Sequence, residues 1–214
     1  MKLRFRFRHI VLYLLLLPVV MLYSCQNTPK RLPLLGNPVF KTIGAKPDTI
    51  YPVVPHFAFT DQKNQVIDNN TFKNKIYVAD FFFISCPTIC PVMTASMKRV
   101  YDSYAQNQDI LFISHTIDPK YDTPERLDKY ASALNADPNK WHFVTGNRDS
   151  IYKLAEKGYY SPAHKDTTID GGYVLSGGLI LIDKQGHMRG VYDGTNKEET
   201  DQLINDIQVL IKQG

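Results

Sequence analysis

Two cysteines carry most of the chemistry that this sequence offers. Cys86 and Cys90 lie in the segment 85–91 (SCPTICP), between an apolar run and an amphipathic one. At a strand-to-helix junction the helix dipole lowers the pKa of a thiol, so we expect both thiols to deprotonate readily. Two thiolates suit Cu(I), and the pair can also form a disulfide if the Cβ atoms approach to ~4 Å. A purely structural bridge is less favoured, because so short a loop restricts the unfolded chain little.

The elements around the cysteines alternate between strand and helix. The run 76–84 (IYVADFFFI) predicts a strand that is buried on both faces and ends just before Cys86. Helical spacing of apolar residues predicts a helix over 92–104. Further strands are expected at 110–115, 141–144, 179–183 and 188–192, and further helices at 124–134, 149–157 and 198–212. This order predicts a thioredoxin-like α/β domain over 53–214, with a central mixed sheet flanked by helices and a β-hairpin before the C-terminal helix.

The N-terminus indicates export. Four basic residues precede the uncharged apolar run 10–23, which is the layout of a signal peptide and is too short for a bilayer-spanning helix of ~20 residues. The segment 22–25 (LYSC) resembles the lipobox of bacterial lipoproteins, which predicts a signal peptide over 1–24 and lipidation of Cys25. An uncleaved N-terminal anchor is the alternative. Both place the domain outside the cytoplasm, membrane-anchored on the periplasmic side of a bacterial membrane.

The charge balance argues against nucleic acid as a partner. The formal net charge is +4, but residues 1–24 hold four basic and no acidic side chains, so the remainder carries 21 of each sign. Nucleic-acid binding normally needs a basic face.

The segment 25–52 is rich in Pro, Lys, Asn and Thr without an apolar period, and we interpret it as a tether between membrane and domain.

Three further segments carry a family resemblance. They are 82–91 (FFISCPTICP), the stretch 114–125 (SHTIDPKYDTPE) and 140–146 (KWHFVTG). In this order they resemble the Sco/SenC family, thioredoxin-like copper proteins that serve assembly of the binuclear copper centre of cytochrome c oxidase. The resemblance covers about residues 53–212. It implies that Cys86 and Cys90 bind copper together with one histidine from a later loop.

That histidine is where the sequence departs from the family pattern. The matching segment is 175–186 (LSGGLILIDKQG), so Leu175 stands at the ligand position. Leucine has no lone pair, and we expect weaker copper binding, with Cu(II) affected more than Cu(I). His164 is the candidate substitute ligand. The other histidines of the domain are less favoured as ligands: His115 and His142 are expected at strand ends with local hydrogen bonds, His187 in a hairpin turn and His56 near the start of the domain.

Several other residues have structural interpretations that we prefer. Asp118 and Asp122 precede a helix and are expected to cap it rather than to support the cysteine loop. Trp141 is expected in the core. Met93 and Met97 lie one helical turn apart, which is more typical of a core face than of a thioether copper site.

Three functions follow from these features. The first is a copper-binding module that passes Cu(I) to the copper-centre subunit of cytochrome c oxidase or to another exported thiol or copper protein. The second is an extracytoplasmic thiol-disulfide oxidoreductase without stable copper binding. The third and least favoured is a peroxiredoxin-like peroxidase, because Phe83 and Ala79 occupy the positions where that family places its Thr and Pro.

Overall fold

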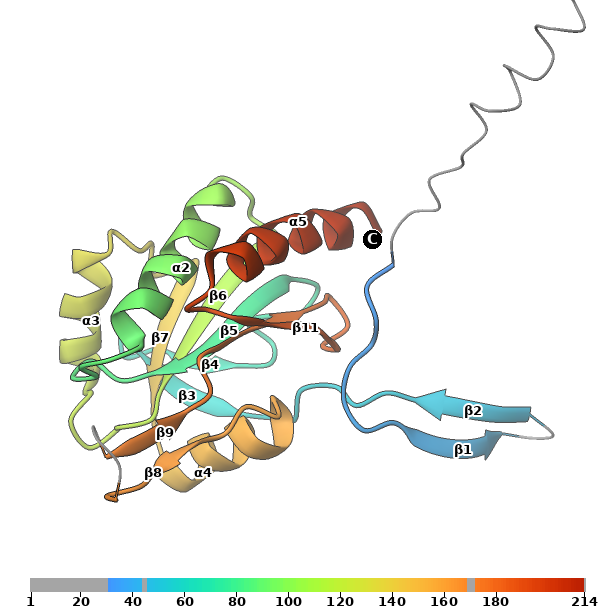
Figure 1. Ribbon diagram of the computed structural model, residues 1–214, viewed down its shortest axis with the longest axis horizontal. Helices are drawn as coiled ribbons and strands as arrows, with labels where there is room; N and C mark the ends of the chain where they lie inside the picture. Colours follow the sequence, from blue (N-terminus) through green and yellow to red (C-terminus); the bar gives the residue numbers. More distant parts are fainter. Residues whose placement is uncertain (1–30, 44–45, 169–171, 214) are drawn as a thin grey trace, which may run out of the picture. The chain divides into compact units, whose positions relative to one another are not determined.

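The strand β5 (Ile76–Phe82), which leads to the cysteines, lies inside the main sheet, and all seven of its residues are buried. The computed structural model describes residues 31–43, 46–168 and 172–213. Within these residues seven strands form one mixed sheet in the order β11-β10-β5-β6-β7-β3-β4 (Figure 1). The other six are β3 (Ala58–Asp61), β4 (Val66–Asp68), β6 (Ile110–Thr116), β7 (Trp141–Thr145), β10 (Gly178–Ile182) and β11 (Met188–Asp193). The strands β5, β6 and β7 are parallel, and the rest pair antiparallel.

Helices cover both faces of this sheet, as the sequence predicts. They are α2 (Cys90–Ser103), α3 (Pro124–Ala133), α4 (Arg148–Lys153), which continues as the π-helical turn η1 (Leu154–Gly158), and α5 (Lys197–Gln213). The helices α2 and α3 pack on one face, where Tyr101 contacts Trp141 and Tyr130 contacts Phe82. Tyr159, directly after η1, contacts Phe81 on the opposite face. The predicted central mixed sheet flanked by helices is therefore confirmed.

The ends of the predicted elements shift by only a few residues, for identifiable reasons. α3 begins at Pro124 because Thr123 caps it, accepting a hydrogen bond from the Arg126 N–H (3.4 Å). The helix expected over 149–157 changes from α to π geometry at Leu154. Trp141, Met93 and Met97 are all buried in the core, as expected.

The segment 25–52, interpreted as a tether, has regular structure in its described part. The strands β1 (Val39–Ile43) and β2 (Lys46–Ile50) form an antiparallel pair, drawn in blue in Figure 1. Ahead of them, Leu32 is buried and the Leu35 N–H donates to the Met188 carbonyl (2.8 Å). Local sequence gives no sign of this docking, because its partners lie some 150 residues away. The predicted signal peptide (1–24) and Cys25 lie outside the described residues.

A second short ribbon was also not predicted. The strands β8 (Ala163–Lys165) and β9 (Tyr173–Leu175) pair antiparallel, with Ala163 opposite Leu175 and His164 opposite Val174. Three-residue strands are too short to leave a period in the sequence.

Among the residues that the structure describes, none of the helices has both the length and the apolar composition required to cross a bilayer.

Arg189 holds the N-terminal segment against the β10–β11 hairpin. Its guanidinium donates to the carbonyls of Leu32 (2.5 Å) and Pro33 (3.0 Å) and pairs with buried Asp183 (2.8 Å). We predict that Arg189→Ala lowers the free energy of unfolding by about 2–4 kcal/mol, because it leaves a buried carboxylate without its cationic partner. Chemical denaturation measures this loss, and limited proteolysis should detect earlier cleavage after Arg31.

Arg148→Ala is the matched control. The Arg148 side chain is 60% exposed and pairs with its neighbour Asp149 at 3.5 Å, so we expect a change below about 0.5 kcal/mol. Equal losses for the two arginine variants would contradict the role assigned to Arg189.

Candidate functional site

The two cysteines sit on either side of the junction between β5 and α2. Cys86 lies in the loop that follows the strand, and its N–H donates to the Phe83 carbonyl (3.2 Å). Cys90 is the first residue of α2, two residues before the predicted start of that helix, and Pro91 follows it. Both thiols are free, with Cys86 8% exposed and Cys90 2% exposed. Both cysteines are therefore buried, Cys86 slightly less than Cys90.

Hydrogen bonds make the two thiols unequal. Burial alone would raise the pKa of Cys86, but hydrogen bonds from the Cys90 thiol, from the Thr88 and Cys90 N–H groups and from the Thr88 hydroxyl bring that pKa below its usual value. Burial raises the pKa of Cys90, and the hydrogen bond to Cys86 and the negative charges of Cys86 and Asp80 raise it further. The expectation that both thiols deprotonate readily is therefore wrong for Cys90. Cys86 is therefore the more acidic thiol of the pair, and the Cys90 thiol is the hydrogen-bond donor that stabilises its thiolate form.

Asp80 is a buried acid beside this pair that sequence reasoning missed. It lies on β5 opposite Ser114, and its Oδ1 has no hydrogen-bond partner within the described residues. Burial raises the pKa of Asp80 to about 7, against the lowering effect of its hydrogen bond with Ser114. Ser114 also accepts a hydrogen bond from the Trp141 indole (2.9 Å). The signal was present in the sequence, as one carboxylate inside an otherwise apolar strand.

Asp122 supports the cysteine loop rather than capping a helix. Its carboxylate accepts hydrogen bonds from the Ile84 N–H (3.1 Å) and from the Thr116 hydroxyl (2.6 Å). These bonds tie the end of β5 to the end of β6, just before Cys86. The preferred interpretation of Asp122 as a cap is therefore wrong, because the neighbouring Thr123 fills that role.

Asp118 likewise does not cap α3. Its backbone carbonyl accepts from the Tyr121 and Asp122 N–H groups, and its side chain is hydrogen-bonded to Tyr173. The Tyr173 ring in turn lies 4.7 Å from the ring of Phe83, centre to centre. Asp118 therefore connects the segment before α3 to strand β9, on the side that borders the cysteine loop.

The ribbon β8–β9 positions both Leu175 and His164. Leu175 packs partly buried against the core, and two residues later a Cβ at Gly177 would lie 3.8 Å from the Ile89 side chain. Because neighbouring side chains of a strand alternate between faces, His164, opposite Val174, lies on the face of the ribbon opposite to Leu175, where it is exposed. The chain after Leu175 thus borders the cysteine loop, whereas His164 points away from that face.

The described part of the chain contains no cluster of three His, Cys, Asp or Glu side chains that could hold a metal. His142 is hydrogen-bonded to Asp61 (3.3 Å), and the backbone of His187 is bonded to Asp183 in a hairpin turn. Neither histidine is a sequence neighbour of a cysteine, and neither of these hydrogen bonds involves the cysteine loop. The thiol pair therefore stands without an imidazole ligand in this arrangement.

His115 differs from its prediction. It is fully buried, and neither ring nitrogen has a hydrogen-bond partner among the described residues. Burial lowers the pKa of His115 to about 3, so the ring is neutral. Its neighbours are aromatic rings: Phe57, Phe59, Phe81 and Tyr159. The expected local hydrogen bonds are absent because these four aromatic rings surround the imidazole.

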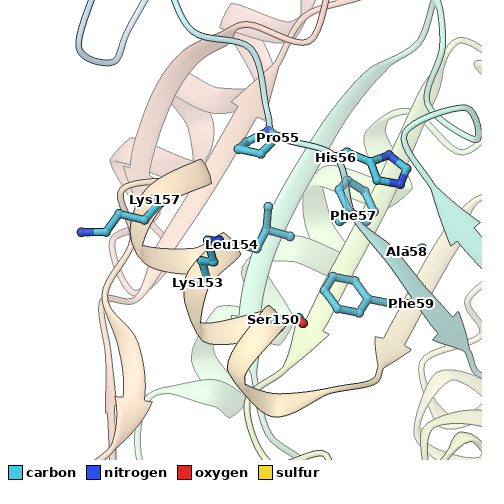
Figure 2. Close-up of a pocket in the computed structure, with 9 residues that line it drawn as sticks. All are labelled: Pro55, His56, Phe57, Ala58, Phe59, Ser150, Lys153, Leu154 and Lys157. Carbon is cyan, nitrogen blue, oxygen red and sulfur yellow. The ribbon is translucent and has the colours of Figure 1, made fainter.

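His56 lines a separate pocket, shown in Figure 2. This pocket has a volume of about 390 Å³ and lies between the segment 55–59 and the helix pair α4 and η1. Phe57, Phe59 and Leu154 form its apolar wall, and Lys157 extends away from it (Figure 2). None of its lining residues belongs to the cysteine loop, so it is not part of the thiol site.

The family model described as SCO1/SenC matches residues 45–212. Two relatives are the SCO1 protein homolog of Bacillus subtilis, 30% identical over 74% of this chain and 82% of its own length, and a Stutzerimonas stutzeri protein named for copper binding, 29% identical over 64% of this chain and 67% of its own length.

Solved structures agree with this match. A SCO1/SenC family lipoprotein from Bacillus anthracis is similar at 28% identity with a TM-score of 0.68, over 74% of this chain and 95% of that one. BsSco, a member of the Sco family of cytochrome c oxidase assembly proteins, is similar at 29% identity with a TM-score of 0.65, over 74% of this chain and 92% of that one. The predicted thioredoxin-like fold is therefore confirmed.

The unequal thiols predict unequal reactivity. At pH 7 to 8 we expect iodoacetamide to modify Cys86 faster than Cys90 by on the order of tenfold, because the thiolate is the reactive species. Cys90→Ala removes a hydrogen-bond donor, so the pKa of Cys86 should rise and its modification should require a higher pH. Thr88→Val should shift the profile less, in the same direction. Peptide mapping by mass spectrometry over a pH series measures this, and a Cys86 profile unchanged by Cys90→Ala would contradict the assignment.

Proposed function

The chain belongs to the SCO1/SenC family, and from that premise we propose that it binds Cu(I) through Cys86 and Cys90 and serves assembly of the binuclear copper centre of cytochrome c oxidase. Its relatives support this proposal, since one is named for copper binding and another is a cytochrome c oxidase assembly protein. Copper is the cargo here. The acceptor is the copper-centre subunit of the oxidase or another exported thiol or copper protein.

The arrangement of the two thiols is the observation that carries the proposal. The Cys90 side chain is hydrogen-bonded to the Cys86 side chain, which lowers the pKa of Cys86, and two hydrogen-bonded sulfurs are suited to share one soft ion. Binding of Cu(I) by both sulfurs displaces the Cys90 proton. Two soft ligands without an imidazole favour Cu(I) over Cu(II). A site with two protein ligands also leaves the ion open to additional ligands from an acceptor, as transfer requires.

The proposed location follows from the N-terminus. We propose that residues 1–24 are a signal peptide and that a lipid on Cys25 anchors the chain to the periplasmic side of a bacterial membrane. The segment 25–52 then connects the lipid to the thioredoxin-like domain over 53–214. The Bacillus anthracis structure of a family lipoprotein supports this location.

Competition for Cu(I) against a chelator of known affinity tests the copper site. We expect Cys86→Ser and Cys90→Ser each to abolish binding, and Leu175→His to raise affinity by on the order of tenfold or more, because it adds a ligand beside the cysteine loop. His164→Ala should change nothing, since that side chain lies on the other face of the ribbon. Val174→His is the matched control, because it adds an imidazole to the face opposite Leu175.

Two outcomes would overturn the copper assignment. One is an affinity for Cu(I) that is unchanged when either cysteine is replaced. The other is an equal gain from Leu175→His and Val174→His, which would mean that any added histidine on the ribbon captures the metal.

A second function is favoured by the unequal pKa values of the thiols. In a thiol-disulfide oxidoreductase, the Cys86 thiolate would attack a client disulfide and release one client thiolate. Cys90 would then lose its proton and attack the Cys86 sulfur, releasing the second client thiolate and leaving a Cys86–Cys90 disulfide. Asp80, whose pKa of about 7 is set mainly by burial, is the nearby base suited to accept the Cys90 proton. Two electrons pass to the client, and an external dithiol must restore the pair.

Trapping distinguishes this function from copper transfer. We predict that Cys90→Ser accumulates a mixed disulfide with an oxidised dithiol client, because the attacking thiolate remains and the resolving thiol is gone. Cys86→Ser should trap far less, since the pKa of Cys90 is raised. Non-reducing electrophoresis measures the adduct, and equal trapping by both variants would contradict these roles.

The peroxidase remains the least supported function, because Phe83 and Ala79 are buried core residues at the positions of its Thr and Pro.

A further inference from the structure

Exposed apolar side chains concentrate near the N-terminal end of the described chain. Of the eleven large hydrophobic residues that are exposed in the described part, five lie within the short stretch 34–53. We call these five the N-terminal patch: Leu34, Val39, Phe40, Ile50 and Val53. Phe40 is 75% exposed, more than any other of the eleven. So dense a set is unusual for a surface that faces only water.

The strands β1 and β2 present apolar side chains on both of their faces. Val39 pairs with Ile50, and Phe40 pairs with Thr49 on the opposite face. Val39 and Ile50 are 55% and 40% exposed, so among the described residues neither face of the hairpin is covered. A two-stranded hairpin alone is only marginally stable in water. The patch therefore has the properties of a surface that an external partner covers.

The charge distribution identifies that partner. Residues 26–50 carry four basic side chains and one acidic side chain, whereas residues 51–214 carry 17 basic and 20 acidic ones. An anionic surface would attract the first segment and repel the rest of the domain. Basic residues next to exposed apolar side chains are the combination that binds anionic lipid headgroups.

The docking of Leu32 limits how far the patch can lie from the proposed anchor. Leu32 lies seven positions after Cys25, a distance of at most about 25 Å when the chain is fully extended. Leu32 is buried and its carbonyl accepts a hydrogen bond from Arg189, so this residue is fixed to the domain. The short distance keeps the domain next to the bilayer. This step rests on the proposed lipidation of Cys25.

We propose that the N-terminal patch lies on the surface of the anionic bilayer in which the Cys25 lipid is inserted. Phe40 enters the headgroup region, and the net positive charge of the segment 26–50 favours its contact with the lipid phosphates. The segment is then a second membrane attachment and not a free tether. The more acidic domain that carries Cys86 and Cys90 is held away from the lipid surface.

Fluorescence of the full mature lipoprotein in proteoliposomes tests this. Phe40→Trp and Val66→Trp place a tryptophan at exposed positions of similar class, the second on β4 with Val66 at 72% exposure. The native Trp141 is buried and gives the same background in both. In phosphatidylethanolamine–phosphatidylglycerol vesicles we expect a blue shift and at least a twofold quenching by brominated lipid for Phe40→Trp, and neither for Val66→Trp. Adding Lys41→Glu to Phe40→Trp should reduce the quenching.

Three outcomes would overturn the proposal. The first is equal access of aqueous iodide to both tryptophans, without quenching by brominated lipid. The second is a blue shift of Phe40→Trp that persists in detergent and depends on protein concentration, which would identify a second copy as the partner. The third is a mature protein whose mass shows no acyl chains on Cys25. None of these readouts depends on copper, so failure of the copper site is distinguished from failure of the membrane contact.

Discussion

Burial of β5 on both faces is the constraint on which the rest of this molecule depends. Its seven residues all lie in the core, between β6 on one side and β10 on the other. A strand in that position cannot shift register without moving apolar side chains out of the core on both faces. Its end, and therefore the start of the cysteine loop, has a defined place. The hydrogen bonds of Asp122 to Ile84 and Thr116 secure that end.

The same burial controls the chemistry of the thiols. A low-dielectric environment disfavours every charged form, so the pair can hold one negative charge far more easily than two. The hydrogen bonds from the Cys90 thiol, from local N–H groups and from the Thr88 hydroxyl lower the pKa of Cys86 and favour that charge on its sulfur. The buried Asp80 adds to the cost of a second charge on Cys90. A bound Cu(I) ion would compensate that cost with its own positive charge, and a disulfide would remove both charges.

Much of the fold could be predicted from the sequence, because long apolar runs and the helical spacing of apolar residues indicate which strands and helices pack into the core. This holds for β5, for α2 and for α5. The cysteine pair could be identified in the same way, since spacing and neighbours define it. The short ribbon β8–β9 and the hairpin β1–β2 could not, because three to five residues leave no usable period. Asp122 was misjudged because its partners, Ile84 and Thr116, belong to the ends of two different strands.

The sequence by itself determined the α/β domain and the position of Cys86 and Cys90 after a buried strand. These features depend on residue type and local spacing, which the amino-acid sequence shows directly. Tertiary structure alone decided which thiol has the lowered pKa, that Asp80 lies beside the pair and that His164 and Leu175 occupy opposite faces of one ribbon. It also decided that Leu32 and Leu35 dock on the β10–β11 hairpin. Each of these depends on burial or on contacts between distant segments, which only folding brings together.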